Sequence, residues 1–287
     1  MVGNPHLISY FQKLIDEDRL SHGYLFFGRK GIGKFAFARS LSHVFEDNRP
    51  LDQALEAEGP SFLVDATIID QPSVGIDDIR AVKRFVAIKP IVSRRRTVII
   101  NNADFLTVEA QQAMLKITED ALASSLFILV SSRPDMLMPT VLSRFMRVYF
   151  RRPPADEIER WLQDRFGVDR KLAREAIELS LGSPYGALEL VQNPVALKER
   201  RIRADTLGRL NLADAYEEIS SLNGEADMEK FFESFLLFRA RRPMEEPESY
   251  IAAMKELSKR MWAVNALNTN KRLQMEALAN TVASVKS

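Results

Sequence analysis

Residues 24–38, YLFFGRKGIGKFAFA, place an apolar run, a glycine-rich loop and an alanine-rich helical pattern in direct succession. The loop fits the pattern G-x-x-x-x-G-K through Gly28, Gly33 and Lys34, with Gly31 between them. After a strand and before a helix, backbone N–H groups of such a loop and the helix N-terminus can cradle phosphate. This context favours an ancestral phosphate-binding loop over a plain strand-to-helix turn.

Three positions around this loop depart from those of an active nucleotide hydrolase. Phe35 follows the loop lysine, where Ser or Thr would supply a hydroxyl to magnesium. Asn101 and Asn102 follow the apolar run TVII, where an Asp would help to hold magnesium and a Glu would orient water. An amide is a poor base, and the loss of general-base assistance costs about 10²- to 10⁴-fold in rate. We therefore expect no hydrolysis at this degenerate site and weak or absent nucleotide affinity.

The pattern around the loop predicts an α/β fold. Apolar runs at 24–28, 62–70, 97–101 and 126–132 are expected to be strands. Residues 7–20, 33–45, 75–90 and 107–119 have apolar side chains at helical spacing. Strands separated by helices indicate a parallel sheet with right-handed crossovers, flanked by helices.

The second half of the chain is expected to be helical. Arg-Arg-Pro-Pro at 151–154 interrupts any helix and suggests a first domain boundary, and Asn193-Pro194 suggests a second. Three domains follow: 1–150 with the loop, a small helical domain at 151–194, and an all-α domain at 195–287. The helical patterns lie at 155–166, 169–181, 184–192, 195–222, 227–240, 248–267 and 271–285.

Composition excludes several classes of function. Forty basic and 39 acidic residues leave a net charge of +1, so no global field attracts nucleic acid or membrane. The absence of cysteine excludes disulfides and thiolate metal sites, and the three histidines lack metal-ligand spacing. No signal peptide and no apolar stretch of about 18 residues is evident. We therefore expect a cytoplasmic protein with no metal cofactor and no membrane partner.

Three segments carry a resemblance to a known family. They are RLSHGYLFFGRKGIGK (19–34), TVIINNADFLTVEAQQAMLKITED (97–120) and FILVSSRPDMLMPTVLSRF (127–145). In this order they resemble the AAA+ clamp-loader subunits of bacterial DNA polymerase III, and among these the delta-prime branch most closely. The last segment is similar to the family's sensor-1 strand and Ser-Arg-Cys signature, present here as Ser143-Arg144-Phe145.

The resemblance implies a RecA-like AAA+ module, a helical lid and a helical collar that joins five subunits in a ring. It implies that Arg144 acts in trans on the ATP of a neighbouring subunit, while the chain's own site does no chemistry. The implied partners are the motor ATPase subunits, a delta-like subunit, the sliding clamp and, through the assembly, primed DNA. The chain would then belong to a DNA-directed DNA polymerase holoenzyme without being catalytic alone.

Two departures from the family leave other functions open. Bacterial members usually carry a four-cysteine zinc module where residues 46–62 contain no cysteine, so zinc is not expected. Tyr185 and Gly186 stand where the lid's sensor-2 segment often has a basic residue. The alternative is an active AAA+ ATPase, such as the motor subunit of a clamp loader or a related DNA remodeller. A third possibility is a stand-alone nucleotide-sensing or DNA-binding regulator with a decayed site.

Overall fold

The structure, a computed structural model, describes residues 2–56, 63–120 and 124–207. The chain divides into two compact units. Unit 1 comprises residues 1–173 and 182–188, and unit 2 comprises residues 174–181 and those from 189 onward. The glycine loop, both asparagines and Arg144 all belong to unit 1, so this unit is the one that positions the candidate site.

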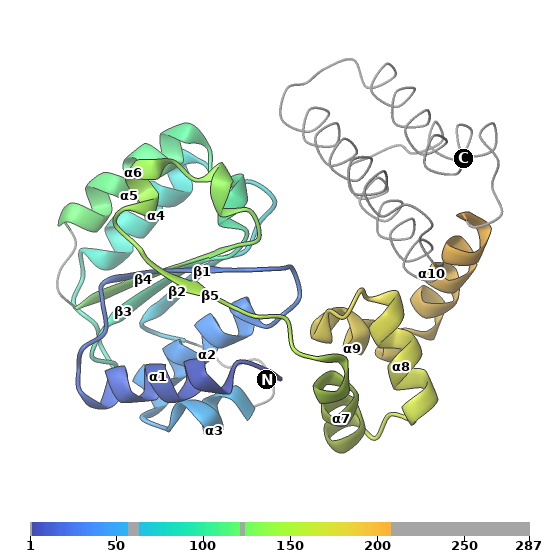
Figure 1. The fold of residues 1–287 in the computed structure, drawn as a ribbon. Coiled ribbons are helices and arrows are strands. Elements are labelled where there is room, and N and C mark those ends of the chain that lie inside the picture. The colour runs from blue at the N-terminus through green and yellow to red at the C-terminus, as the bar shows by residue number, and fades with distance from the viewer. Residues whose placement is uncertain (1, 57–62, 121–123, 208–287) are drawn as a thin grey trace, which may run out of the picture. The chain divides into compact units, whose positions relative to one another are not determined.

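A five-stranded parallel sheet forms the centre of unit 1, in the order β2-β3-β4-β1-β5 (Figure 1). The strands are β1 (Gly23–Phe27), β2 (Ala66–Ile69), β3 (Arg96–Ile100), β4 (Ser125–Ser131) and β5 (Met146–Tyr149). Every residue of β3 and β4 is buried, as expected for central strands that are covered on both faces. Because all strands are parallel, the loops at their carboxyl ends meet along one edge of the sheet.

Helices cover both faces of this sheet, as Figure 1 shows. One layer holds α1 (Pro5–Asp16), α2 (Lys34–Asp47) and α3 (Leu51–Glu56). The other holds α4 (Ile76–Val86), α5 (Val108–Asp120) and α6 (Pro139–Leu142), with the short 3-10 helices η1 (Ala103–Phe105) and η2 (Pro134–Met136) in its connections. Unit 1 therefore forms a three-layer α/β/α sandwich, and the glycine loop lies at the edge of its sheet where the strands have their carboxyl ends.

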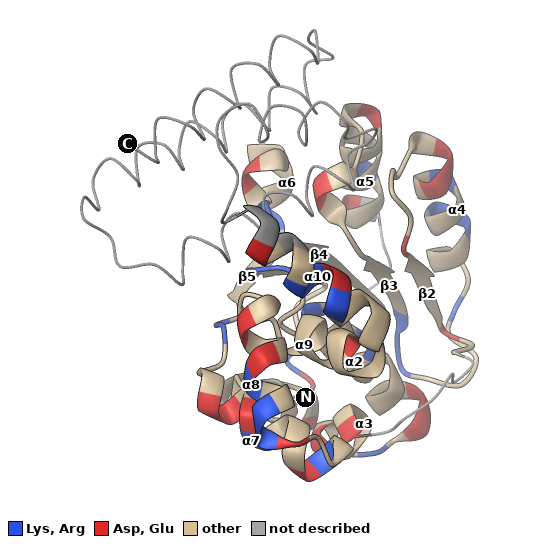
Figure 2. Ribbon diagram, turned by 90° about the vertical axis from the view of Figure 1, so that its right-hand side faces the viewer, with Lys and Arg blue, Asp and Glu red and all other residues tan. Residues whose placement is uncertain are grey.

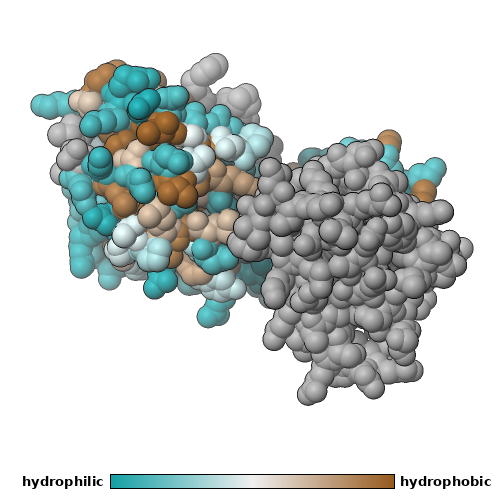
Figure 3. Space-filling model, turned by 90° about the horizontal axis from the view of Figure 1, so that it is seen from above, coloured by the Kyte–Doolittle hydropathy of each residue, from teal (hydrophilic) through white to brown (hydrophobic). Residues whose placement is uncertain are grey.

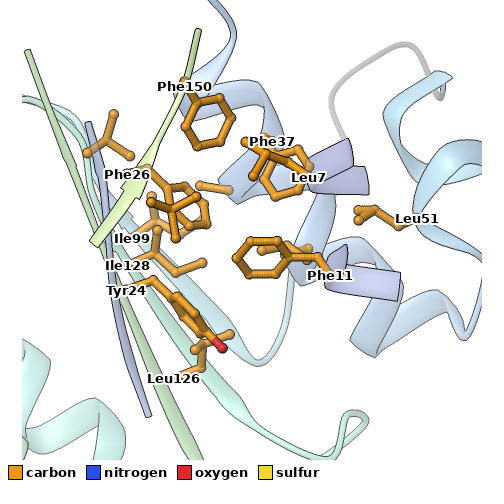
Figure 4. Close-up of a cluster of buried hydrophobic side chains, with 14 of the residues drawn as sticks. Leu7, Phe11, Tyr24, Phe26, Phe37, Leu51, Ile99, Leu126, Ile128 and Phe150 are labelled. Atoms are coloured by element: carbon orange, nitrogen blue, oxygen red, sulfur yellow. The ribbon is translucent and has the colours of Figure 1, made fainter. Parts of the chain in front are cut away.

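Alternation along the strands separates the two cores. Tyr24 and Phe26 of β1 face the α1–α3 layer, whereas Leu25 between them belongs to the cluster under α4, α5 and α6. Figure 4 shows the first cluster, in which aromatic rings from the sheet meet those of α1 and α2. Phe26 and Phe37 lie 5.6 Å apart between ring centroids. Phe37 belongs to α2, so this packing fixes the helix that begins directly after the glycine loop.

The predicted α/β fold is confirmed, with two differences in the strands. In the described part of the run expected at 62–70, residues 63–70, the strand is limited to the four residues of β2, and Asp65 before it turns its buried carboxylate toward the backbone of residues 91–93. The edge strand β5 was not predicted, since it is short and only Val148 among its residues is buried. Edge strands show a weak apolar pattern because one side faces solvent.

Four further helices are described: α7 (Ala155–Phe166), α8 (Arg170–Leu179), α9 (Pro184–Gln192) and α10 (Pro194–Leu207). They coincide with the helical patterns expected at 155–166, 169–181, 184–192 and the start of 195–222. The helices expected beyond residue 207, and most of the expected all-α domain, lie outside the described residues. Within unit 2, the guanidinium of Arg201 pairs with the carboxylate of Glu175 at 2.5 and 2.7 Å.

The described surface mixes basic and acidic residues, as the nearly equal numbers of both in the sequence lead one to expect. Figure 2 shows acidic and basic residues interspersed along the helices. Figure 3 looks down on the layer of α4, α5 and α6 and shows apolar residues among hydrophilic ones. Exposed apolar side chains of this layer include Ile76, Phe105 and Val108. Among the described residues, no helix is both long and apolar enough to cross a membrane.

Candidate functional site

The carboxyl ends of β1, β3 and β4 bring the predicted loop and the two asparagines to the same edge of the sheet. The glycine loop follows β1, Asn101 and Asn102 follow β3, and Ser132 follows β4. Lys34 donates to the hydroxyl of Ser132 at 3.4 Å, which joins the glycine loop to the end of β4. Crevices outside the carboxyl ends of parallel strands are the usual ligand sites of such sheets.

Glycine is required at two positions of the loop for steric reasons. Gly28 and Gly31 have φ angles of 142° and 73°, in the region that L side chains rarely adopt. A Cβ atom on Gly31 would approach the Ser183 hydroxyl to 2.0 Å, and one on Gly28 would approach the Phe150 carbonyl oxygen to 2.6 Å. At these two positions the loop thus adopts a backbone conformation that other residues would strain.

Lys34 is buried and is engaged by the loop itself. Its ammonium donates to the backbone carbonyls of Gly28 at 2.7 Å and Arg29 at 2.5 Å. Burial lowers the pKa of Lys34 to about 8, and the negative charge of Asp104 opposes this shift. A phosphate would have to compete with these carbonyls for the same donors.

The segment before α9 also contacts the loop within unit 1. The Gly31 carbonyl accepts hydrogen bonds from the Ser183 hydroxyl and the Tyr185 backbone N–H, both at 3.2 Å. The Ser183 hydroxyl in turn accepts from the Gly186 N–H at 3.0 Å. Tyr185 and Gly186 therefore contribute backbone groups that hold the loop in place.

Phe35, Asn101 and Asn102, the three positions that depart from an active hydrolase, make other contacts in this structure. Phe35 packs its partly buried ring against the core cluster of the α1–α3 layer. The side-chain amides of Asn101 and Asn102 both donate to one carboxylate oxygen of Asp70, at 2.9 and 3.3 Å. Among the described residues, no group of three or more His, Cys, Asp or Glu could hold a metal ion.

The sequence interpretation missed Asp104. Its buried carboxylate accepts the Ser131 hydroxyl and the backbone N–H groups of Ser132 at 3.0 Å and Arg133 at 3.1 Å. These bonds tie the η1 connection to the end of β4 and place a negative charge near Lys34. The available signal was an aspartate inside the apolar stretch Ala103-Asp104-Phe105-Leu106, where a charge needs partners.

Arg144 lies at the opposite end of the sheet from the glycine loop. It occupies the turn between α6 and β5, and Met146 at the start of β5 pairs with Tyr24, the second residue of β1. The loop begins only after Phe27 at the other end of that strand, roughly 13 Å further at about 3.3 Å per residue. The structure therefore does not bring Arg144 together with Lys34.

The turn that carries Arg144 is fixed by its neighbours. Phe145 is buried in the cluster under α4, α5 and α6, and a Cβ atom on Gly23 would approach its ring to 3.0 Å. Arg144 donates to the Thr140 carbonyl at 3.1 Å and to the carboxylate of Glu119 near the end of α5. Its side chain remains 35% exposed, so it is open to a further acceptor.

A second feature of unit 1 is the connection between α4 and β3. The buried carboxylate of Asp65 accepts the backbone N–H groups of Ile91 at 2.8 Å, Val92 at 2.6 Å and Ser93 at 2.7 Å. Arg96 is also buried, donates to the carbonyls of residues 88 and 89, and lies 3.6 Å from Asp65. A buried ion pair thus holds this connection. We call residues 87–95 the Asp65 loop, after the carboxylate outside the loop that binds its backbone.

The Asp65 loop presents apolar side chains to solvent. Ile88, Ile91 and Val92 are 59%, 73% and 59% exposed. Exposed cations of α4 and of the loop, Arg84, Lys89 and Arg94, lie close to them in the sequence. Exposed apolar patches rimmed by polar residues are typical of surfaces that contact other proteins.

Comparison with known proteins places the chain among DNA polymerase III subunits. A family profile described as "DNA polymerase III, delta subunit" matches residues 3–154. The gamma/tau subunit of Mycobacterium tuberculosis is 27% identical over 214 residues, covering 68% of this chain and 36% of that protein. The tau subunit of Bacillus subtilis is 30% identical over 161 residues, covering 53% and 28%. The chain thus spans about a third of the length of these relatives.

A solved structure supports the fold. A gamma-subunit-related protein of DNA polymerase III from Thermotoga maritima superimposes with a TM-score of 0.51 at 18% sequence identity. The match covers 98% of this chain and 99% of that protein. At this level of identity the likeness concerns the arrangement of helices and strands.

Proposed function

The chain belongs to the DNA polymerase III delta-subunit family of AAA+ clamp-loader proteins, and we propose that it is a delta-prime-like subunit that does not hydrolyse ATP. In this proposal it completes the ATP site of a neighbouring subunit with Arg144 and helps to load the sliding clamp onto primed DNA. In this proposal the chain itself holds no cofactor, and ATP is bound by the partner subunits. Such a protein works in the cytoplasm, as part of a hetero-oligomer.

The position of Arg144 is the observation that carries the proposal. It lies at the end of the sheet away from the chain's own glycine loop, next to the start of β5. A guanidinium is always charged and offers a planar fork of donors, which suits charge stabilisation on a transferring phosphoryl group. Because Arg144 is remote from its own loop, the phosphate that it serves would belong to another chain.

The state of the glycine loop supports the non-hydrolysing role. Lys34 is bound to loop carbonyls, Gly31 is bound to the segment before α9, and Phe35 packs against the core. The amides of Asn101 and Asn102 offer neither a metal ligand of the required charge nor a base. The alternative, an active motor subunit, would need these three positions to be replaced by functional groups.

We predict that the purified chain has no ATPase activity above background, because the magnesium ligands and the general base are absent. The measurement is steady-state phosphate release by the chain alone and after addition of the motor subunits. Calorimetry with ATP and magnesium should show no micromolar affinity.

The control for this prediction is Lys34→Ala. If turnover by the isolated chain is measurable and is abolished by this substitution, the chain is an active ATPase and the alternative holds. A stand-alone regulator would differ from both, since its nucleotide or DNA response would not need the motor subunits.

The Asp65 loop supports the sliding clamp as a partner. Protein interfaces place apolar anchors at their centre and polar groups at the rim. Ile88, Ile91 and Val92 supply such anchors, and Arg84, Lys89 and Arg94 supply cations around them. We expect the matching surface of the clamp to hold an apolar pocket bordered by carboxylates.

We predict that Ile91→Ser combined with Val92→Ser weakens clamp binding by at least about tenfold, since burial of one aliphatic side chain contributes about 1.5–3 kcal/mol. The binding of the assembled loader to labelled clamp in the presence of ATP measures this. Val195→Ser on α10 is the matched control, because Val195 is 67% exposed and lies outside the loop. Equal affinities of the double variant and the control would remove the loop from the clamp interface.

A further inference from the structure

Glu119, which pairs with Arg144, lies at an unfavourable place for a carboxylate. Glu119 and Asp120 end α5, and the last turn of this helix contains no basic residue. The C-terminus of a helix carries partial negative charge, so acidic side chains there destabilise the helix and favour a nearby cation. The dipole of α5 therefore does not stabilise the charge of Glu119, and the structure pairs this carboxylate with a cation from another connection.

That cation is Arg144, which is 25 residues away in sequence and lies in a different connection. One guanidinium nitrogen, Nη2, donates to the carboxylate of Glu119, and Nη1 donates to the Thr140 carbonyl at 3.1 Å. The two acceptors hold the guanidinium from two elements, α5 and α6. A guanidinium has five N–H donors, so donors remain for a third acceptor.

We propose that Glu119 is a positioning residue for Arg144: it holds the guanidinium in the orientation from which it reaches the neighbouring subunit's phosphate. This inference rests on the proposed function of Arg144 in trans. Glu119 itself touches no reacting atom. It limits the rotamers of a long side chain before the phosphate arrives, and this pre-organisation keeps the donors near their productive geometry.

The competing explanation is an ordinary surface ion pair. Both side chains are partly exposed, and pairs of this kind contribute little to stability. The two explanations differ in what the loss of Glu119 changes. A positioning residue affects turnover only when Arg144 is present, whereas a structural residue affects the chain whether or not Arg144 is present.

The first test is independent of activity and uses the full isolated chain. Phenylglyoxal modifies exposed arginine, and peptide mass spectrometry gives the rate at each site. Glu119→Ala is expected to increase the modification rate of Arg144 by about two- to fivefold, the equivalent of one exposed ion pair. Arg147, which is exposed on β5, serves as the internal control and should not change. An unchanged rate at Arg144 would show that Glu119 does not hold it, and would overturn the inference.

The second test is a double-mutant cycle in the assembled clamp loader, with clamp- and DNA-stimulated ATP turnover as the readout. Glu119→Ala is expected to lower the Arg144-dependent part of kcat by about two- to fivefold, with KM for ATP unchanged. In an Arg144→Ala background the same substitution should have no further effect. Glu109→Ala, an exposed acid at the other end of α5, is the matched control.

The outcomes separate the inference from the proposed function. Equal losses in both backgrounds, or no loss in either, would overturn the positioning role of Glu119 while leaving a damaging Arg144→Ala intact. If Arg144→Ala itself were silent, the trans role of Arg144 would fail. The modification experiment would then still report whether the two residues are paired.

Discussion

Replacement of Arg144 by alanine is expected to lower ATP turnover at the one site that this chain completes by about 10³- to 10⁵-fold, the usual contribution of an arginine finger. Turnover of the whole assembly should fall only in part, because the other sites are completed by other subunits. Folding should be little changed, since buried Phe145 anchors the turn and Arg144 adds only partly exposed bonds to Thr140 and Glu119. Clamp- and DNA-stimulated ATPase and clamp-loading rates of a reconstituted complex measure the effect.

Two substitutions calibrate this result. Arg144→Lys should be nearly as damaging, because an ammonium cannot reproduce the planar fork of donors. Arg147→Ala on β5 should be milder, since this residue is not in the signature turn. Normal clamp loading by a correctly assembled Arg144→Ala complex would leave the chain a purely structural subunit.

The second large effect is expected in stability. Asp65→Ala should lower the free energy of unfolding by about 3–5 kcal/mol, the cost of removing one partner of a buried ion pair. The substitution leaves Arg96 buried without its partner, and leaves the N–H groups of residues 91–93 without their acceptor. Chemical denaturation of the full chain measures the loss, and Asp164→Ala, at an exposed position of α7, is the control.

The same carboxylate predicts a dependence of stability on pH. Burial raises the pKa of Asp65, but hydrogen bonds from Ser93, Ile91 and Val92, together with the charge of Arg96, outweigh burial and lower the pKa below its usual 3.8. A group whose folded pKa is lowered stabilises the fold above its unfolded pKa, and that contribution is lost as the pH falls through the folded pKa. Below about pH 4 the difference in stability between the native chain and Asp65→Ala should therefore shrink. A constant difference down to pH 2 would contradict this account.

The sequence predicted those elements of the fold whose apolar residues are also the residues that the structure buries. The run from Tyr24 to Phe27 is apolar because β1 is central, and the glycines after it are required by backbone geometry. The predicted start of this strand was wrong for residues 63–65, because apolar character there did not reveal that Asp65 would turn into the protein. The strand β5 was not predicted from the sequence, because only one of its four residues is buried.

The candidate site was predictable in its residues and not in its arrangement. The motif identified Lys34 and Arg144, yet their separation to opposite ends of the sheet depends on the register of β5 against β1. Asp104 could not be found from a motif, because its importance lies in the amides and the hydroxyl that surround it. The roles of these residues in binding or catalysis stay predictions.

Phe145 and Gly23 share one volume between the sheet and α6, since a methyl group on Gly23 would already press on the aromatic ring. Size at the two positions is consequently coupled: a residue smaller than Phe145 beside Arg144 would leave room for a side chain on Gly23, the first residue of β1. The pair should co-vary in an alignment of relatives. An engineer who grafts the signature turn into another AAA+ protein would do best to transfer both residues, because a side chain in place of Gly23 would press on the aromatic ring.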